Sequence, residues 1–132
     1  MNIERVEKFT AIITIGKAYG YSSGEYSLEE LHIALQEHQN KRIREKNIYL
    51  STFVYQGDIV MSGQIEPHYR LELINYPRFP LDKKVFKDEV TKLAKHLARF
   101  FKQNRLVIVF HNEIVMLEEN KDIDPRINSN ER

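Results

Sequence analysis

Residues 81–101 read LDKKVFKDEVTKLAKHLARFF, and this stretch does most to decide the fold. Its large apolar residues recur at helical spacing over about four turns and therefore share one face. They are Phe86, Val90, Leu93, Leu97 and Phe101. Asp82 has the side chain of an N-cap and follows the chain-breaking prolines Pro77 and Pro80. The stretch predicts an amphipathic helix that packs one face against a neighbouring layer.

Two strands are predicted on the N-terminal side of this helix. Residues 68–76 alternate between apolar and polar side chains, which is the period of a strand. Residues 48–55 are rich in β-branched and aromatic side chains and predict another strand. The intervening residues 56–67 contain two glycines and a proline, so we expect a long irregular hairpin there.

The first part of the chain has the same order of strand and helix. Residues 9–15 alternate and predict a strand, and the glycine-rich residues 16–24 predict a loop. Ser27 and Glu30 then have the spacing of a capping box, which opens a helix. The apolar face of that helix comprises Leu28, Leu31, Leu35 and His38. We expect the helix to fray near its basic residues 41–46.

After the second helix, residues 106–117 are mostly apolar on both faces and predict a single last strand. The order of elements is then β-α-β-β-α-β. This order predicts an α+β fold of the ferredoxin-like kind, with an antiparallel four-stranded sheet and two helices on one face. Residues 1–117 form one domain in this prediction. Residues 118–132 are polar and are predicted to be a disordered tail.

The sheet face away from the helices, called the open face below, is predicted to be part apolar and part charged. Strand alternation assigns it Thr10, Ile12, Thr14, Arg70, Glu72, Val107, Val109, His111 and Glu113. A second subunit often covers a mixed face of this kind, so we expect a homodimer. The alternative is that the open face forms the wall of a cleft.

Topology also predicts which loops meet. In this fold the connections 16–26, 56–67 and 102–105 share one edge of the sheet, and long loops on a rigid scaffold often carry function. The candidate ligand-binding residues at this edge and on the open face are Lys17, Tyr19, Tyr21, Glu66, His68, Arg70, Arg105 and His111. The glycine loop lies before a helix N-terminus, as anion sites do, but it lacks the spacing of a phosphate-binding loop. A permissive turn is the favoured interpretation.

Composition narrows the function. The formal net charge is +1, which gives no bulk attraction to nucleic acid or to acidic membranes and argues against both as partners. There is no cysteine, which excludes thiolate catalysis and cysteine-ligated metals and is typical of a cytoplasmic protein. The five histidines form no metal-binding pair at helical spacing, so we predict no metal and no cofactor.

The chain resembles the DUF3574-type family of small bacterial domains of unknown function. The resemblance rests on the strand ending at Gly16, the loop to Ser27 with its Glu29-Glu30 helix start, Tyr55-x-Gly57, Gly63, Glu66-Pro67 and Tyr76-Pro77. It spans much of residues 9–117. Because the activity of that family is not known, the resemblance implies no chemistry.

Two functions are compatible with these features. The first is a small binding or interaction module that dimerises through the open face, and the absence of a catalytic motif favours it. The second is a small-molecule-binding enzyme of the dimeric α+β barrel type, with a site at the open face and the loops above it. Nucleic-acid binding through the basic face of the second helix is a third function, which the low net charge disfavours.

Overall fold

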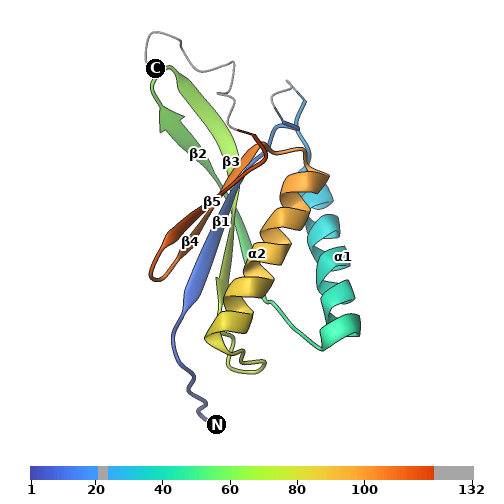
Figure 1. Cartoon of the computed structure of the whole chain (residues 1–132), viewed down its shortest axis with the longest axis vertical. Coiled ribbons are helices and arrows are strands. Elements are labelled where there is room, and N and C mark those ends of the chain that lie inside the picture. The colour runs from blue at the N-terminus through green and yellow to red at the C-terminus, as the bar shows by residue number, and fades with distance from the viewer. Residues whose placement is uncertain (21–23, 121–132) are drawn as a thin grey trace.

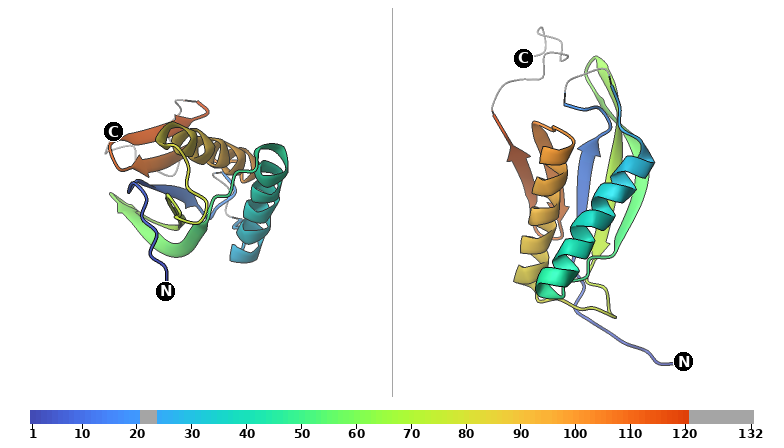
Figure 2. Two further views of the ribbon diagram at one scale, coloured as in Figure 1. Left: turned by 90° about the horizontal axis from the view of Figure 1, so that it is seen from below. Right: turned by 90° about the vertical axis from the view of Figure 1, so that its right-hand side faces the viewer.

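The computed structural model describes residues 1–20 and 24–120, which form a sheet with both helices packed on one face (Figures 1 and 2). The elements are β1 (Thr10–Gly16), α1 (Leu28–Lys46), β2 (Thr52–Met61), β3 (Gln64–Ile74), α2 (Lys83–Phe100), β4 (Arg105–Phe110) and β5 (Ile114–Glu118). The sheet has five antiparallel strands in the order β2-β3-β1-β4-β5. The predicted α+β class is therefore confirmed. No helix among the described residues is long and apolar enough to cross a membrane.

The predicted count of four strands is wrong, because residues 106–117 form two strands rather than one. β4 and β5 are joined by a tight turn in which the Phe110 N–H donates to the Glu113 carbonyl oxygen at 2.8 Å. His111 and Glu113, which were assigned to the open face, lie in this turn instead. β5 ends at Glu118, and the predicted disorder of the tail from residue 121 onward lies outside the described residues.

The core lies between the sheet and the helices, and strand alternation builds it. Ala11, Ile13 and Ile15 of β1 are fully buried, whereas Ile12 and Thr14 are only half-buried on the other face. The predicted apolar face of α2 is buried throughout. The strand parity predicted for β1, β3 and β4 is thus confirmed, and burial of the apolar side chains provides the main stabilisation.

Local capping positions both helices as predicted. The Ser27 hydroxyl accepts from the Glu30 N–H at 3.1 Å, and the Glu30 carboxylate accepts from the Ser27 N–H at 3.3 Å. Asp82 caps α2 by accepting from the Lys84 N–H at 3.1 Å. α1 does not fray within its basic run: it continues to Lys46 and ends at Asn47, which adopts a left-handed conformation with φ 55°.

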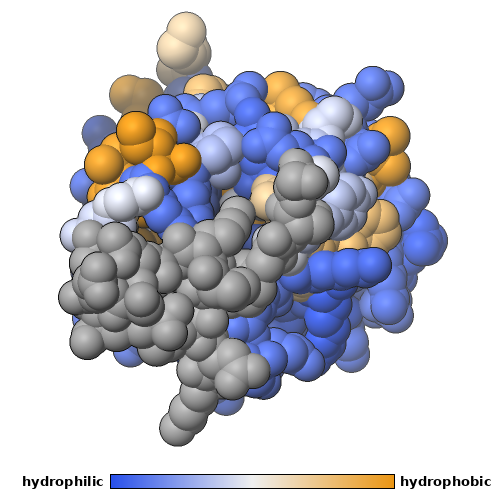
Figure 3. All heavy atoms as spheres, turned by 90° about the horizontal axis from the view of Figure 1, so that it is seen from above, coloured by the Kyte–Doolittle hydropathy of each residue, from blue (hydrophilic) through white to orange (hydrophobic). Residues whose placement is uncertain are grey.

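β2 and β3 form one long hairpin that extends beyond the rest of the sheet (Figure 1). The hairpin predicted for residues 56–67 is present, but its pairing is continuous from Thr52 to Met61, so the predicted irregularity is wrong. Gly63 takes φ 79° in the turn, a conformation that glycine adopts without strain. The tip exposes Val60, Met61 and Ile65. From above, this end of the molecule is largely hydrophilic with separate hydrophobic patches (Figure 3).

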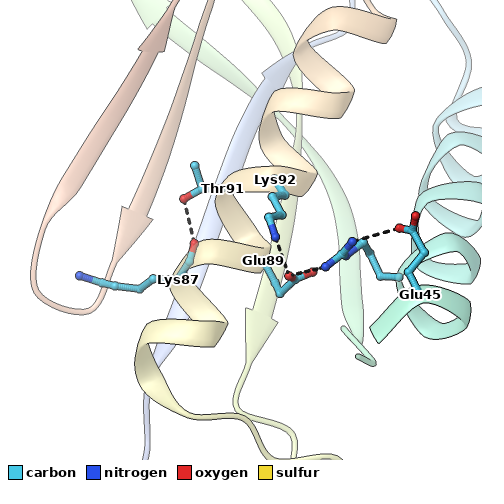
Figure 4. Close-up of polar contacts among 6 residues, drawn as sticks. Glu45, Lys87, Glu89, Thr91 and Lys92 are labelled. Carbon is cyan, nitrogen blue, oxygen red and sulfur yellow. Dashed lines mark hydrogen bonds and ion pairs between the residues drawn. The ribbon is translucent and has the colours of Figure 1, made fainter. Parts of the chain in front are cut away.

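A buried ion pair joins the helices. Arg42 of α1 donates to both carboxylate oxygens of Glu89 on α2, at 2.8 Å and 2.9 Å. Lys92 also approaches Glu89, and Glu45 contacts Arg42 from the exposed side (Figure 4). Burial alone would raise the pKa of the Glu89 carboxyl, but the hydrogen bonds and charge of Arg42 hold it below its usual range.

Two histidine rings also meet between the helices. His38 of α1 is 8% exposed, and its ring centroid lies 5.0 Å from that of His96 on α2. The Nε2 atoms of both rings are buried and have no hydrogen-bond partner. Burial, aided by the nearby positive charges, lowers the pKa of His38 to about 4 and also lowers that of His96. Both rings are therefore neutral at pH 7.

These histidines predict a loss of stability in mild acid. In the unfolded chain His38 protonates near its ordinary pKa of about 6.5, whereas in the folded chain it stays neutral down to about 4. The contribution of His38 to the free energy of unfolding is therefore largest above pH 6.5 and should fall by about 2 kcal/mol between pH 7 and pH 5. Urea unfolding at pH 7, 6 and 5 measures this. The dependence of the free energy of unfolding on pH should become weaker in His38→Leu. It should persist in His32→Leu, which changes an exposed histidine of the same helix.

Candidate functional site

The open face is organised as rows of residues across the sheet, and its uppermost row surrounds His68. His68 of β3 is paired with Gly16 of β1 on one side and Gly57 of β2 on the other. Thr14 of β1 is paired with Val107 of β4, so two residues further along this register Arg105 lies beside Gly16. Arg105 is in turn paired with Glu118 of β5. The histidine ring thus has a residue without a side chain on each flank.

The two glycines leave space around the imidazole. A Cβ atom added to Gly57 would meet nothing within 4 Å. A Cβ atom added to Gly16 would lie 3.6 Å from His68 Nε2 and 3.0 Å from Gln103 Oε1. Substituting Gly16 would therefore crowd the Gln103 side chain and fill the space beside His68 Nε2. His68, Gly16, Gly57 and Gln103 are called the His68 site below.

Hydrogen bonding sets the tautomer of His68. Its Nδ1 lies 3.0 Å from the Glu66 carbonyl oxygen. Because a carbonyl oxygen only accepts, Nδ1 carries the proton in the neutral ring, and Nε2 is left as an acceptor. Nε2 is also the nitrogen nearest Gly16. The site therefore presents a ring nitrogen that can accept a hydrogen bond from a ligand.

The predicted connections 16–26 and 102–105 meet at this end, whereas residues 56–67 reach it as the paired strands β2 and β3 rather than as a loop. Gln103, which precedes β4, donates to the Ala18 carbonyl oxygen at 2.6 Å, and the Lys17 N–H donates to the Pro67 carbonyl oxygen at 3.1 Å. Sequence reasoning did not single out Gln103 as a site residue. The only sequence signal for it was its place inside the 102–105 connection.

A buried aromatic cluster supports the site from the helix side. Tyr26 stacks on Phe101 with centroids 3.7 Å apart, and its hydroxyl donates to the Gly16 carbonyl oxygen at 2.5 Å. The Tyr69 hydroxyl donates to the Tyr26 carbonyl oxygen at 3.2 Å. Burial raises the pKa of both tyrosines, so both stay protonated and act as donors. The cluster fixes the backbone at Gly16.

The predicted site residues divide between the two faces of the sheet. His68, Arg70 and Arg105 lie on the open face. Lys17 lies on the helix side, where its Nζ donates to Gln56 at 2.9 Å and lies 5.1 Å from the centroid of the Tyr69 ring. Tyr19 packs against the same cluster and donates to Glu30 at 3.3 Å.

The other predicted residues do not all join the site. Glu66 precedes His68 on β3 and contributes its backbone carbonyl. His111 lies at the opposite end of the sheet, where the centroids of its ring and of the Phe9 ring are 6.2 Å apart. Tyr21 lies outside the described residues. Arg105 forms an ion pair with Glu118 at 2.6 Å.

The middle row of the open face adds groups that can bind a ligand below His68. It comprises Tyr55, Arg70, Thr14, Val107 and Met116. Arg70 is exposed and can bind a carboxylate, and the half-buried ring of Tyr55 offers an aromatic face. No group of three or more His, Asp or Glu residues in the described chain could hold a metal ion.

Comparison with known proteins finds likeness in structure only. No family model and no curated protein matches the chain. The fold is similar to that of a phage SAM lyase in complex with S-methyl-5'-thioadenosine, with a TM-score of 0.66 and 22% identity over 89% of this chain and 96% of that one. It is also similar to a phage SAM lyase in the apo state, with a TM-score of 0.62 and 20% identity over 92% and 100%. These likenesses show that the chain shares their fold.

Proposed function

We propose that this chain binds S-adenosylmethionine on the open face at the His68 site and cleaves it to S-methyl-5'-thioadenosine. The fold likeness to the phage SAM lyase supports the choice of ligand. The observation that carries the proposal within this chain is the placement of His68 between Gly16 and Gly57, with Nε2 as an acceptor on the Gly16 side and open space on the Gly57 side. Tyr55 and Arg70 below it suit a cationic sulfur and a carboxylate.

The reaction can proceed without a metal, water or an external base. The methionine carboxylate attacks the γ-carbon of its own side chain, so a C–O bond forms while the C–S bond breaks. The electron pair of the broken bond goes to sulfur, which becomes a neutral thioether, and the other product is a five-membered lactone that keeps its ammonium group. No proton moves in this step. His68 Nε2 would accept a hydrogen bond from the ligand and hold it in the reactive geometry.

This chemistry favours a covered site. A negative carboxylate and a positive sulfonium neutralise each other as the bond forms, and surroundings of low polarity favour such a step. On the monomer, however, the open face is exposed. A second copy of the chain that covers this face would exclude water from the His68 site, so dimerisation and ligand binding form one proposal.

The test of activity is release of S-methyl-5'-thioadenosine from S-adenosylmethionine, followed by chromatography. We expect His68→Ala to lower kcat/KM by about tenfold or more. His32→Ala, which removes an exposed histidine on α1, should leave kcat/KM unchanged. If the wild-type chain neither forms the product nor gains thermal stability with millimolar ligand, the proposal is wrong.

A second candidate function, an interaction module that acts as a homodimer, rests on the apolar part of the open face. Phe53 is 68% exposed, Ile114 70% and Met116 55%, and their strands place all three on that face. Phe53 lies on one edge strand and Ile114 and Met116 on the other, so exposed apolar side chains flank this face on both sides, where a second copy could cover them. Tyr55 and Val107 extend the same surface.

The oligomeric state tests this surface. Native mass spectrometry should give a dimer for the wild type, with or without bound ligand. Phe53→Glu and Met116→Glu place charges on the open face and should shift the protein to monomer. Ile33→Glu, an exposed apolar residue of α1, is the matched control and should stay dimeric. A wild-type monomer at micromolar concentration would rule out the covered site.

A further inference from the structure

A second candidate site lies on the other side of the molecule, in a groove built only from helix residues. The groove has a volume of about 740 Å³ and runs between α1 and α2. Figure 2 shows these two helices side by side on the face of the sheet opposite the open face. We call it the interhelix groove. None of its lining residues belongs to the His68 site.

The lining of the interhelix groove is strongly basic. Its cations are Lys41, Arg42, Arg44, Lys92, Lys95 and Arg99. Arg42 and Lys92 contact Glu89. The other four cations form no ion pair with the part of the chain that the structure describes. Glu37 and Glu45 are the acidic side chains of the lining, so positive charge is in excess.

Two residues of the lining carry buried hydrogen-bonding atoms without partners. His38 and His96 both belong to the lining, and the Nε2 atom of each is buried and unpaired. A buried polar atom without a partner is unfavourable, so a ligand that supplies the partner gains from it. Positive charges on both helices disfavour a metal cation here. They favour an acceptor-rich anion, to which a neutral imidazole can donate through Nε2–H.

We propose that the interhelix groove binds a phosphate group, either as the free ion or as part of a phosphorylated small molecule. Lys95 and Arg99 attract a phosphate, and the side chains of His38 and His96 lie in the lining beside it, where a small rotation of either ring would let its Nε2–H donate to a phosphate oxygen. Phe100 lines the end of the groove beyond His96, with ring centroids 6.1 Å apart, and is 49% exposed. Its ring suits the planar base of a nucleoside monophosphate.

The experiment is a titration of the ¹⁵N-labelled full-length chain at low ionic strength, followed by NMR of the histidine ring nitrogens. The probes are inorganic phosphate, adenosine monophosphate and adenosine. We expect the first two to shift the Nε2 resonances of His38 and His96 and adenosine to leave them unchanged. If adenosine monophosphate binds more tightly than inorganic phosphate, and if Phe100→Ala removes this difference, the ligand is a nucleotide. If adenosine monophosphate and inorganic phosphate bind equally tightly, the ligand is the free phosphate ion.

Variants that remove one positive charge distinguish specific binding of phosphate in the groove from nonspecific electrostatic attraction of phosphate to the protein. Lys95→Ala should weaken phosphate binding by about threefold or more. Lys84→Ala removes the same charge from the same helix outside the groove and should have no effect. Equal weakening by both variants, or absence of any shift at His38 and His96, overturns the proposal. Because His68 resonances report on the open face separately, this result is independent of the proposed lyase activity.

Discussion

Glu89→Ala is expected to lower the free energy of unfolding by about 3 to 5 kcal/mol, as removal of one partner of a buried ion pair does. The Glu89 side chain is 3% exposed and accepts two hydrogen bonds from Arg42, whose side chain is 13% exposed. The variant would leave the Arg42 guanidinium between the helices without its main counter-charge. Urea unfolding at pH 7 measures the change.

Two further variants test the cause. Glu45→Ala removes the exposed partner of the same arginine and should cost less than about 1 kcal/mol, because solvent screens that pair. The double variant Arg42→Met with Glu89→Leu replaces both charges by apolar side chains and should recover most of the stability. Similar losses in Glu89→Ala and Glu45→Ala would show that burial does not strengthen the Arg42–Glu89 pair.

Tyr26→Ala should be comparably destabilising, by about 3 to 5 kcal/mol, because it removes a buried aromatic side chain and leaves a cavity. Tyr26 contacts Phe101, Tyr19 and Tyr69, and it donates to the Gly16 carbonyl oxygen. We therefore expect the variant also to weaken ligand binding at the His68 site. Urea unfolding and ligand-induced thermal shift measure the two effects.

The conservative variant separates packing from hydrogen bonding at this position. Tyr26→Phe keeps the ring and loses the hydroxyl, so it should cost about 1 kcal/mol. Its effect on ligand binding reports how far the Gly16 carbonyl depends on that hydrogen bond. Tyr76→Ala changes a tyrosine that is 42% exposed and should cost much less than Tyr26→Ala. Equal losses at both tyrosines would contradict the buried cluster.

Most of the fold could be predicted because local signals and hydrophobic periodicity agree. The Ser27 capping box, the Asp82 cap and the alternation around β1 each specify their element without help from distant residues. β5 escaped prediction because its turn, His111-Asn112, contains neither glycine nor proline, and apolar residues continue on both sides. In such a stretch, a single long strand and a tight hairpin give the same pattern of apolar residues in the sequence.

The candidate site could be predicted only as far as topology reaches. Strand order brought the ends of β1, β3 and β4 together, and with them His68 and Arg105. It could not show that Lys17 turns to the helix side, because that depends on contacts with Gln56 and Tyr69. The interhelix groove was hidden because Lys41 and Lys95 each belong to an ordinary solvated helix face. Only the packing of α1 against α2 brings those faces together.

The central position of β1 has a consequence for the order of folding. β2–β3 and β4–β5 are local hairpins, whereas β1 joins them by pairing Thr10 with Ile74 and Ala11 with Phe110. Of the five strands the middle one, β1, is synthesised first, yet its second neighbour, β4, is made only after α2. Such long sequence separation between contacts slows folding. Until β4 is made, one edge of β1 lacks its partner strand, and an unpaired strand edge can pair with other chains.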